Sequence, residues 1–188
     1  MILLDRKEIK KILPRVQKGL YQYLCIQNYF RERIVDKDRE FQRRFNAFYR
    51  VRRGRMWQKG FYAILQEKKN RKYDFRKILL DLQRKTKRVE ASFASKLIAT
   101  LDPKNAVIDS IVLRNLRIMG NRDLKLPYPK SVDRIERIII VYEKLNKLYR
   151  EYLRTPAGRY LVGEFKKMYP NTKISDEKKL DLVLWQKR

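Results

Sequence analysis

The chain has 188 residues, of which 44% are hydrophobic and 37% are charged, which is enough apolar material for one folded domain with a core. There are 48 lysines and arginines against 21 aspartates and glutamates, and the net charge of +27 favours a polyanionic partner, nucleic acid before an anionic membrane. No histidine and a single cysteine exclude Ser-His-Asp and Cys-His nucleophiles, histidine-ligated zinc sites, four-cysteine clusters and a disulfide framework.

A helical spacing of apolar residues in nearly every segment, together with only six glycines and six prolines, predicts an all-α fold. We expect a compact multi-helix domain with about eight or nine helices and no sheet. No apolar run approaches the roughly 18 residues of a membrane-spanning helix, and the first residues lack the apolar core of a signal peptide. Because a single cysteine also suits a reducing compartment, we predict a cytoplasmic protein without a membrane partner.

The first half of the chain predicts five helices that are rich in aromatic residues and in cations. Their ranges are 5–13, 16–35, 36–53, 56–68 and 75–84. Between Gln42 and Arg88 there are 17 basic and three acidic residues, so this segment contributes +14, roughly half of the excess charge. Cations interleaved with Tyr, Trp and Phe are typical of nucleic-acid binding, because phosphates attract cations and unstacked bases pack on flat rings.

Two basic clusters within this segment are candidate nucleic-acid contacts. The first, RRGRMWQK, surrounds Gly54, which lets a strand come close to the backbone; the alternative is an ordinary helix junction with solvated charges. Its candidate residues are Arg52, Arg53, Arg55, Trp57 and Lys59. The second cluster follows the helix at 75–84, and its candidate residues are Lys85, Lys87 and Arg88.

The stretch from Ser92 to Leu116 predicts two short apolar helices with a hinge between them. The first helix has apolar residues spaced by four and three and ends at Asp102, because the residue before a proline is pushed out of the helical region. Asp109 opens the second helix, where its carboxylate can accept a hydrogen bond from the first turn and is favoured by the helix dipole. The stretch therefore predicts one ionised carboxylate held at the start of an apolar helix.

The rest of the chain predicts a stiff, proline-containing loop at 119–129 followed by three helices. Ser131 is predicted to cap a long helix, Thr155 to cap a helix that ends at Met168, and Ser175 to cap the last helix. The apolar stripe of the long helix consists of Val132, Ile135, Ile139, Tyr142, Leu145, Tyr149 and Tyr152.

The motif SFASKL, followed by an aspartate that opens a helix ending in RNL, resembles the core of the helix-hairpin-helix (HhH-GPD) DNA glycosylase superfamily. The nearest resemblance is to a branch of small bacterial proteins with the core SFASKLL…P…DS.VL.NL and the ending ISD.KK.D..LW, here ISDEKKLDLVLW at 174–185. It extends from Leu82 to Arg188 and implies the glycosylase fold, a DNA partner in preference to RNA, and a catalytic carboxylate at Asp109. It further implies nucleic-acid contacts from Ser92, Ser95, Lys96 and Arg114.

The sequence departs from the glycosylase pattern at two places. The family's Leu-Pro-Gly-X-Gly hairpin, whose backbone N–H groups hold a phosphate, is replaced by KTKRVE at 85–90, where the cations would hold a phosphate by charge. The nucleophilic lysine of bifunctional members is replaced by Ser92, so the resemblance implies a monofunctional glycosylase without lyase chemistry.

We therefore expect a monomeric DNA-repair hydrolase that excises a base from a flipped nucleotide. One carboxylate would stabilise the sugar cation, and no metal or cofactor would take part. The alternatives are a non-catalytic DNA- or RNA-binding module on the same scaffold, in which Asp109 is only a cap, and an accessory subunit that meets a ribosome or a phage nucleic acid. We predict a single domain at 1–188, with a basic, aromatic-rich part at 1–88 and the glycosylase-like core and C-terminal helices at 89–188.

Overall fold

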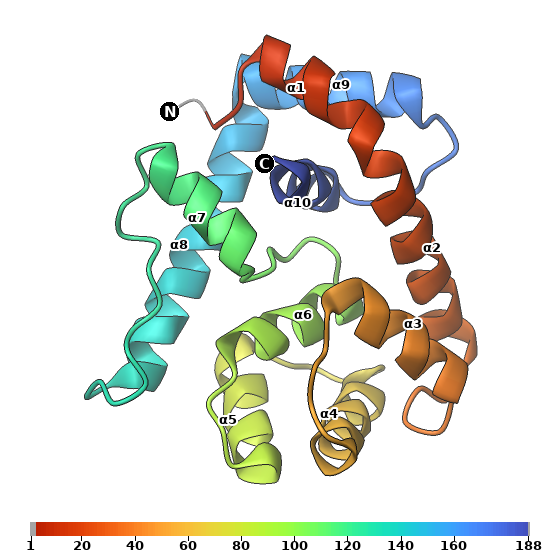
Figure 1. Cartoon of the computed structure of the whole chain (residues 1–188), viewed down its shortest axis with the longest axis vertical. Coiled ribbons are helices and arrows are strands. Elements are labelled where there is room, and N and C mark those ends of the chain that lie inside the picture. The colour runs from red at the N-terminus through yellow and green to blue at the C-terminus, as the bar shows by residue number, and fades with distance from the viewer. Residues whose placement is uncertain (1–2, 188) are drawn as a thin grey trace. The chain divides into compact units, whose positions relative to one another are not determined.

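The computed structural model describes residues 3–187, and every regular element in this part of the chain is a helix (Figure 1). Residues 3–187 form ten α-helices and one 3-10 helix and no strand, so the predicted all-α fold is confirmed with slightly more helices than expected. None of these helices is both long and apolar enough to cross a membrane. The elements are α1 (Arg6–Ile12), the 3-10 helix η1 (Leu13–Val16), α2 (Gln17–Glu32), α3 (Arg39–Tyr49), α4 (Arg55–Lys68), α5 (Phe75–Thr86), α6 (Ala91–Leu101), α7 (Ser110–Ile118), α8 (Arg134–Arg154), α9 (Pro156–Met168) and α10 (Asp176–Gln186).

Six of these helices begin at a short polar side chain that accepts a hydrogen bond from a backbone N–H of the first turn. Such N-caps are local features, because the cap and the N–H group lie within three residues of each other. The capping side chains are Asp5 (α1), Asp38 (α3), Asp74 (α5), Asp109 (α7), Thr155 (α9) and Ser175 (α10). The predicted starts at Asp5, Asp109, Thr155 and Ser175 are therefore confirmed.

The predicted start of the long helix is wrong. Ser131 does not cap it, and α8 begins at Arg134 after Asp133, whose φ of 55° and ψ of 29° lie in the left-handed region. A residue in that conformation cannot continue a right-handed helix, so the two residues before it lie outside α8. Val132 is accordingly 82% exposed, whereas the predicted stripe is buried from Ile139 onward.

The described residues form two compact units. Unit 1 consists of the chain up to Gln17 and from Pro103 onward, and unit 2 is the continuous segment Lys18–Asp102 between them. This division differs from the sequence-based division at residue 88, because α5 packs on α6 and the connection between them lies inside unit 2.

In unit 1, α10 is the central helix, and it contacts α1, η1, α7, α8 and α9 (Figure 1). Residues on all its sides are buried, including Lys178 and Asp181. The Lys178 ammonium lies 2.7 Å from Asp181 Oδ2, and the Tyr149 hydroxyl donates to Asp181 Oδ1 at 3.3 Å. Burial, together with the Asp181 carboxylate, raises the pKa of Tyr149 well above its ordinary value. The interior of unit 1 therefore contains a paired, hydrogen-bonded charge rather than apolar groups alone.

The core of unit 2 is a cluster of aromatic rings from α3 and α4. Phe45 lies within 6 Å of the centroids of Phe41, Phe61 and Tyr62, and all four side chains are buried. The Tyr62 hydroxyl donates to Asn46 Oδ1 at 2.6 Å. Ring pairs at such separations stabilise a core beyond the area that they bury. Most of the aromatic residues that accompany the basic segment are therefore core residues, and the cations are left to the surface.

Candidate nucleic-acid interface

The two predicted basic clusters of unit 2 are close to each other in the structure. A Cβ atom added to Gly60 on α4 would lie 3.5 Å from the Cβ of Lys85, so the residue after Lys59 touches the last turn of α5. The loop before α4 is fixed at the other side by Arg53, whose Nη2 lies 2.9 Å from a carboxylate oxygen of Glu90, the residue before α6. The start of α4, the end of α5 and the α5–α6 connection thus form one surface.

Six cations on this surface are exposed and have no ion pair within residues 3–187. Some other cations of unit 2 are paired, for example Arg43 and Arg44 with Glu40 at 2.7 Å each. The six, which we call the basic interface, are Arg52, Arg55, Lys59, Lys85, Lys87 and Arg88. Unpaired cations that lie together repel one another unless an anion binds between them, so this surface is suited to a polyanion.

The first turn of α4 adds backbone donors to the basic interface. Its N-cap, Gly54, provides no side-chain hydrogen bond, and no acidic residue occurs in the first turn. The free N–H groups of a helix start bind anions and lie at the positive end of the helix dipole. A Cβ at Gly54 would meet no atom within 4 Å, so there is open space beside the N-cap.

Two of the predicted contacts, Arg53 and Trp57, are instead engaged in packing. The Arg53 guanidinium pairs with Glu90 and lies 5.5 Å from the Phe93 ring centroid. Trp57 is half-buried, with its ring 5.2 Å from that of Phe61 in a stacked arrangement and 4.6 Å from that of Phe93. Both side chains therefore connect the start of α4 to α6, and neither is as free to contact a ligand as the six exposed cations are.

The contacts implied by the glycosylase resemblance in α6 are largely buried. Ser95 is fully buried, and its hydroxyl donates to the Ser92 carbonyl at 2.9 Å, while Ser92 itself is half-buried. Lys96 is 7% exposed, donates to the Tyr49 carbonyl at 3.2 Å and lies 5.0 Å from the Phe93 ring centroid. The Ser95 hydroxyl and the Lys96 ammonium thus already have partners inside unit 2, which accounts for their conformations without a ligand.

Asp109 and Arg114 belong to unit 1. Asp109 is half-buried and caps α7, where its Oδ1 accepts from the Ile111 N–H at 2.8 Å. Within residues 3–187 its second carboxylate oxygen accepts no hydrogen bond. Its charge acts on the Tyr149 hydroxyl, which also donates to Asp181, so the surroundings of Asp109 in this unit include a second carboxylate. Arg114 is exposed on α7 and forms no ion pair in this part of the chain.

The buried group of Lys178, Asp181 and Tyr149 was not predicted from the sequence. Lys178 and Asp181 are three residues apart on one helix, a spacing that permits an ion pair, but nothing in the sequence of this helix indicates that the pair is buried. They are buried because α10 packs against α1 and η1 as well as α7, α8 and α9, and the sequence of α10 alone does not indicate these contacts. No group of three or more His, Cys, Asp or Glu side chains in the described part of the chain is placed to hold a metal ion.

Together, the fold and these sites define a strongly basic, all-helical protein with an exposed cationic interface. Comparisons with protein families, with curated proteins and with solved structures found no match for this chain. The resemblance to the helix-hairpin-helix glycosylases therefore rests on the sequence motifs alone.

Proposed function

We propose that this protein binds nucleic acid through the basic interface. The main support is the presence of six exposed cations without ion pairs at the start of α4, the end of α5 and the connection to α6. Cations of this kind bind phosphates and release counterions, whereas paired cations contribute little. The uncapped start of α4 adds backbone donors to the same surface.

Replacing Arg52, Arg55 and Lys59 with alanine tests the location of the interface. Each phosphate contact contributes about 0.9 to the slope of log K against log salt concentration for a B-DNA duplex, so the triple variant should flatten the slope by about 2 to 3. The matched control replaces Lys7, Lys10 and Lys11, three exposed lysines of α1, and changes the net charge equally. Equal losses in the two variants, or an unchanged slope in the first, would place the binding surface elsewhere.

We further propose that the bound nucleic acid is DNA and that Asp109 acts in base excision. The Asp109 cap uses only one carboxylate oxygen, which leaves the other available to a substrate. Base excision passes through a cationic sugar at a flipped nucleotide, and a carboxylate aimed at that cation lowers the barrier. The position of Asp109 at the start of an apolar helix, in the motif that resembles the glycosylases, supports the same role.

Asp109→Asn separates capping from catalysis, because asparagine caps a helix about as well as aspartate but has no charge. On a panel of uracil and damaged-base duplexes, the wild type should excise at least one base, and the variant should lose the activity by about two to three orders of magnitude. Its thermal stability and duplex affinity should remain close to those of the wild type. A wild type without excision on any duplex, or a fully active variant, would leave Asp109 as a cap and favour the binding module.

A further inference from the structure

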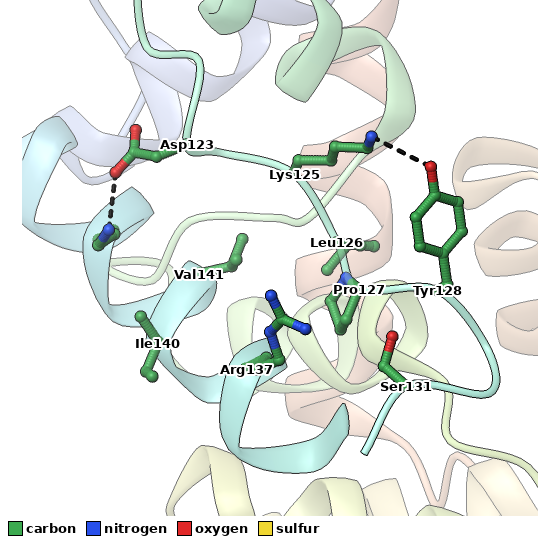
Figure 2. A pocket seen from close by; sticks show the side chains of 10 residues that line it. Asp123, Lys125, Leu126, Pro127, Tyr128, Ser131, Arg137, Ile140 and Val141 are labelled. Carbon is green, nitrogen blue, oxygen red and sulfur yellow. Dashed lines mark hydrogen bonds and ion pairs between the residues drawn. The ribbon is translucent and has the colours of Figure 1, made fainter. Parts of the chain in front are cut away.

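A pocket in unit 1 lies between the loop before α8 and the first half of α8 itself (Figure 2). Its volume is about 390 Å³, at the small end of the range for small-molecule sites, roughly 300–1,000 Å³. We call it the α8 pocket. It is lined by Asp123, Lys125, Leu126, Pro127, Tyr128, Ser131, Arg137, Ile140, Val141 and Lys144.

The loop wall of the α8 pocket is attached to its surroundings at several points. The Asn121 side chain donates to the Leu116 carbonyl at 3.1 Å, and Leu124 is 2% exposed. Asp123 forms an ion pair with Lys144 on α8 at 2.7 Å. These contacts anchor the start of the loop, and its two prolines restrict the backbone beyond it.

The cations of the pocket favour an anionic group. Lys144 is neutralised by Asp123, but Arg137 and Lys125 have no acidic partner within residues 3–187. Figure 2 shows the Arg137 guanidinium reaching from α8 toward Pro127, and the Lys125 ammonium beside the Tyr128 hydroxyl, 3.4 Å away. The Ser131 hydroxyl lies at the other end of the loop from Lys125, on the side of Pro127 and Arg137, and makes no hydrogen bond in this part of the chain. A guanidinium, an ammonium and a hydroxyl are typical ligands of a phosphate.

The remaining walls favour a flat apolar group. Tyr128 is 70% exposed and Ile140 is 50% exposed, both unusually high for large apolar side chains. The Lys125 ammonium lies at the hydroxyl end of the Tyr128 ring, 3.4 Å from the oxygen and 5.1 Å from the ring centroid, so it leaves the ring faces uncovered for stacking. Exposed rings beside cations are the sites on which unstacked bases pack.

We propose that the α8 pocket binds one nucleotide unit, with its phosphate at Arg137 and its base against Tyr128. The unit is either a free nucleoside monophosphate or one nucleotide of a single strand, and both have the same recognition chemistry. The pocket belongs to unit 1 and shares no residue with the basic interface, so this site does not depend on the function proposed above.

Calorimetric titration of the full chain with adenosine monophosphate, adenosine and inorganic phosphate tests the site. The monophosphate should bind, and each of the two partial ligands should bind at least about tenfold more weakly, because each lacks half of the contacts. Arg137→Gln and Tyr128→Leu should each weaken the monophosphate by about tenfold or more. Arg150→Gln is the matched control, since Arg150 is an exposed arginine on α8 outside the pocket, and it should have no effect.

A second titration with a single-stranded oligodeoxyadenosine distinguishes the two sources of the nucleotide. It uses the Arg52, Arg55 and Lys59 alanine variant, so that the basic interface contributes little. Binding of the strand that depends on Arg137 and exceeds that of the monophosphate identifies a strand nucleotide, whereas binding of the monophosphate alone identifies a free nucleotide. No binding of either probe, or equal affinities for Arg137→Gln and Arg150→Gln, would overturn the proposal, whatever the result for the basic interface.

Discussion

Replacing Gly54 with aspartate should stabilise the protein and weaken its nucleic-acid binding at the same time. Gly54 is the N-cap of α4, with φ −64° and ψ 164°, an extended conformation that any residue adopts, and there is room for a side chain. Aspartate and asparagine cap a helix equally well, and either one stabilises the folded protein by a few tenths of a kcal/mol more than glycine does. For a chain of this size this raises the Tm by about 1 °C. Gly54→Asn is therefore a matched control that adds the same cap without the charge.

The aspartate would stand among the cations of the basic interface, where a phosphate is expected. Two like charges about 6 Å apart repel by about 1–3 kcal/mol for effective dielectric constants between those of water and a protein surface. This corresponds to a roughly 5- to 150-fold loss of affinity and to a salt slope flatter by about 1.

Fluorescence anisotropy of a labelled duplex at several salt concentrations measures both quantities, and thermal unfolding measures the cap. If the aspartate and asparagine variants bind duplex equally, the start of α4 lies outside the interface, and its free N–H groups do not contact phosphate.

Three further predictions concern stability. Lys178→Met should cost about 3–5 kcal/mol in the free energy of unfolding in urea, because it leaves the buried Asp181 carboxylate without its cationic partner. Replacing Asp181 with leucine as well should restore most of this free energy, and a mild effect of the single variant would show that water reaches the pair. Gly158→Ala should destabilise the protein by about 1–3 kcal/mol, because the added Cβ would lie 2.1 Å from the Tyr152 carbonyl oxygen. The matched control is Gly163→Ala on the same helix, whose Cβ would meet no atom within 4 Å and which should be neutral or stabilising. Similar Tm values for the two variants would contradict the close approach at Gly158. The pKa of Asp38 is lowered, first by the hydrogen bond from the Phe41 N–H and second by the hydrogen bond from the Arg33 guanidinium. The Asp38 charge therefore stabilises the fold fully above the unfolded pKa near 3.9, and this stabilisation is lost as the pH falls through the lower folded pKa. The unfolding free energies of wild type and Asp38→Asn should therefore differ at pH 6 and converge toward about pH 2, and a constant difference would assign the effect to another group.

The helix starts could be predicted because their determinants are local. Asp109 and Ser175 accept from N–H groups two and three residues away, so the residue type and the following apolar pattern were enough. The error at α8 has the same origin: Ser131 is a good cap by type, but the left-handed conformation of Asp133 two residues later ends the regular backbone there. A residue's preference for a cap does not reveal the conformation of its neighbours.

The candidate site depended on distant contacts and was only partly predictable. The exposed cations of the basic interface were recognised from charge alone, but their common surface depends on the contact of Gly60 with Lys85, which are 25 positions apart. Arg53 and Trp57 are of the same residue types as true contacts, and only their partners Glu90 and Phe93 show that they serve packing. Sequence identifies which residues can bind phosphate, whereas tertiary partners decide which of them remain free.

The interrupted course of unit 1 affects the order in which the protein can assemble during translation. The nascent chain completes unit 2 at Asp102, before any residue of α7 to α10 has been made. Unit 2 can therefore fold while the ribosome is still adding the rest of the chain. Ile9 and Ile12 of α1 are buried in the finished unit, where α1 contacts α9 and α10. These two side chains therefore remain exposed until α9 and α10, which are synthesised more than a hundred residues later, can cover them. A chain truncated after α9 would thus contain a complete unit 2 and a unit 1 that lacks its central helix, and proteases should cleave it within unit 1.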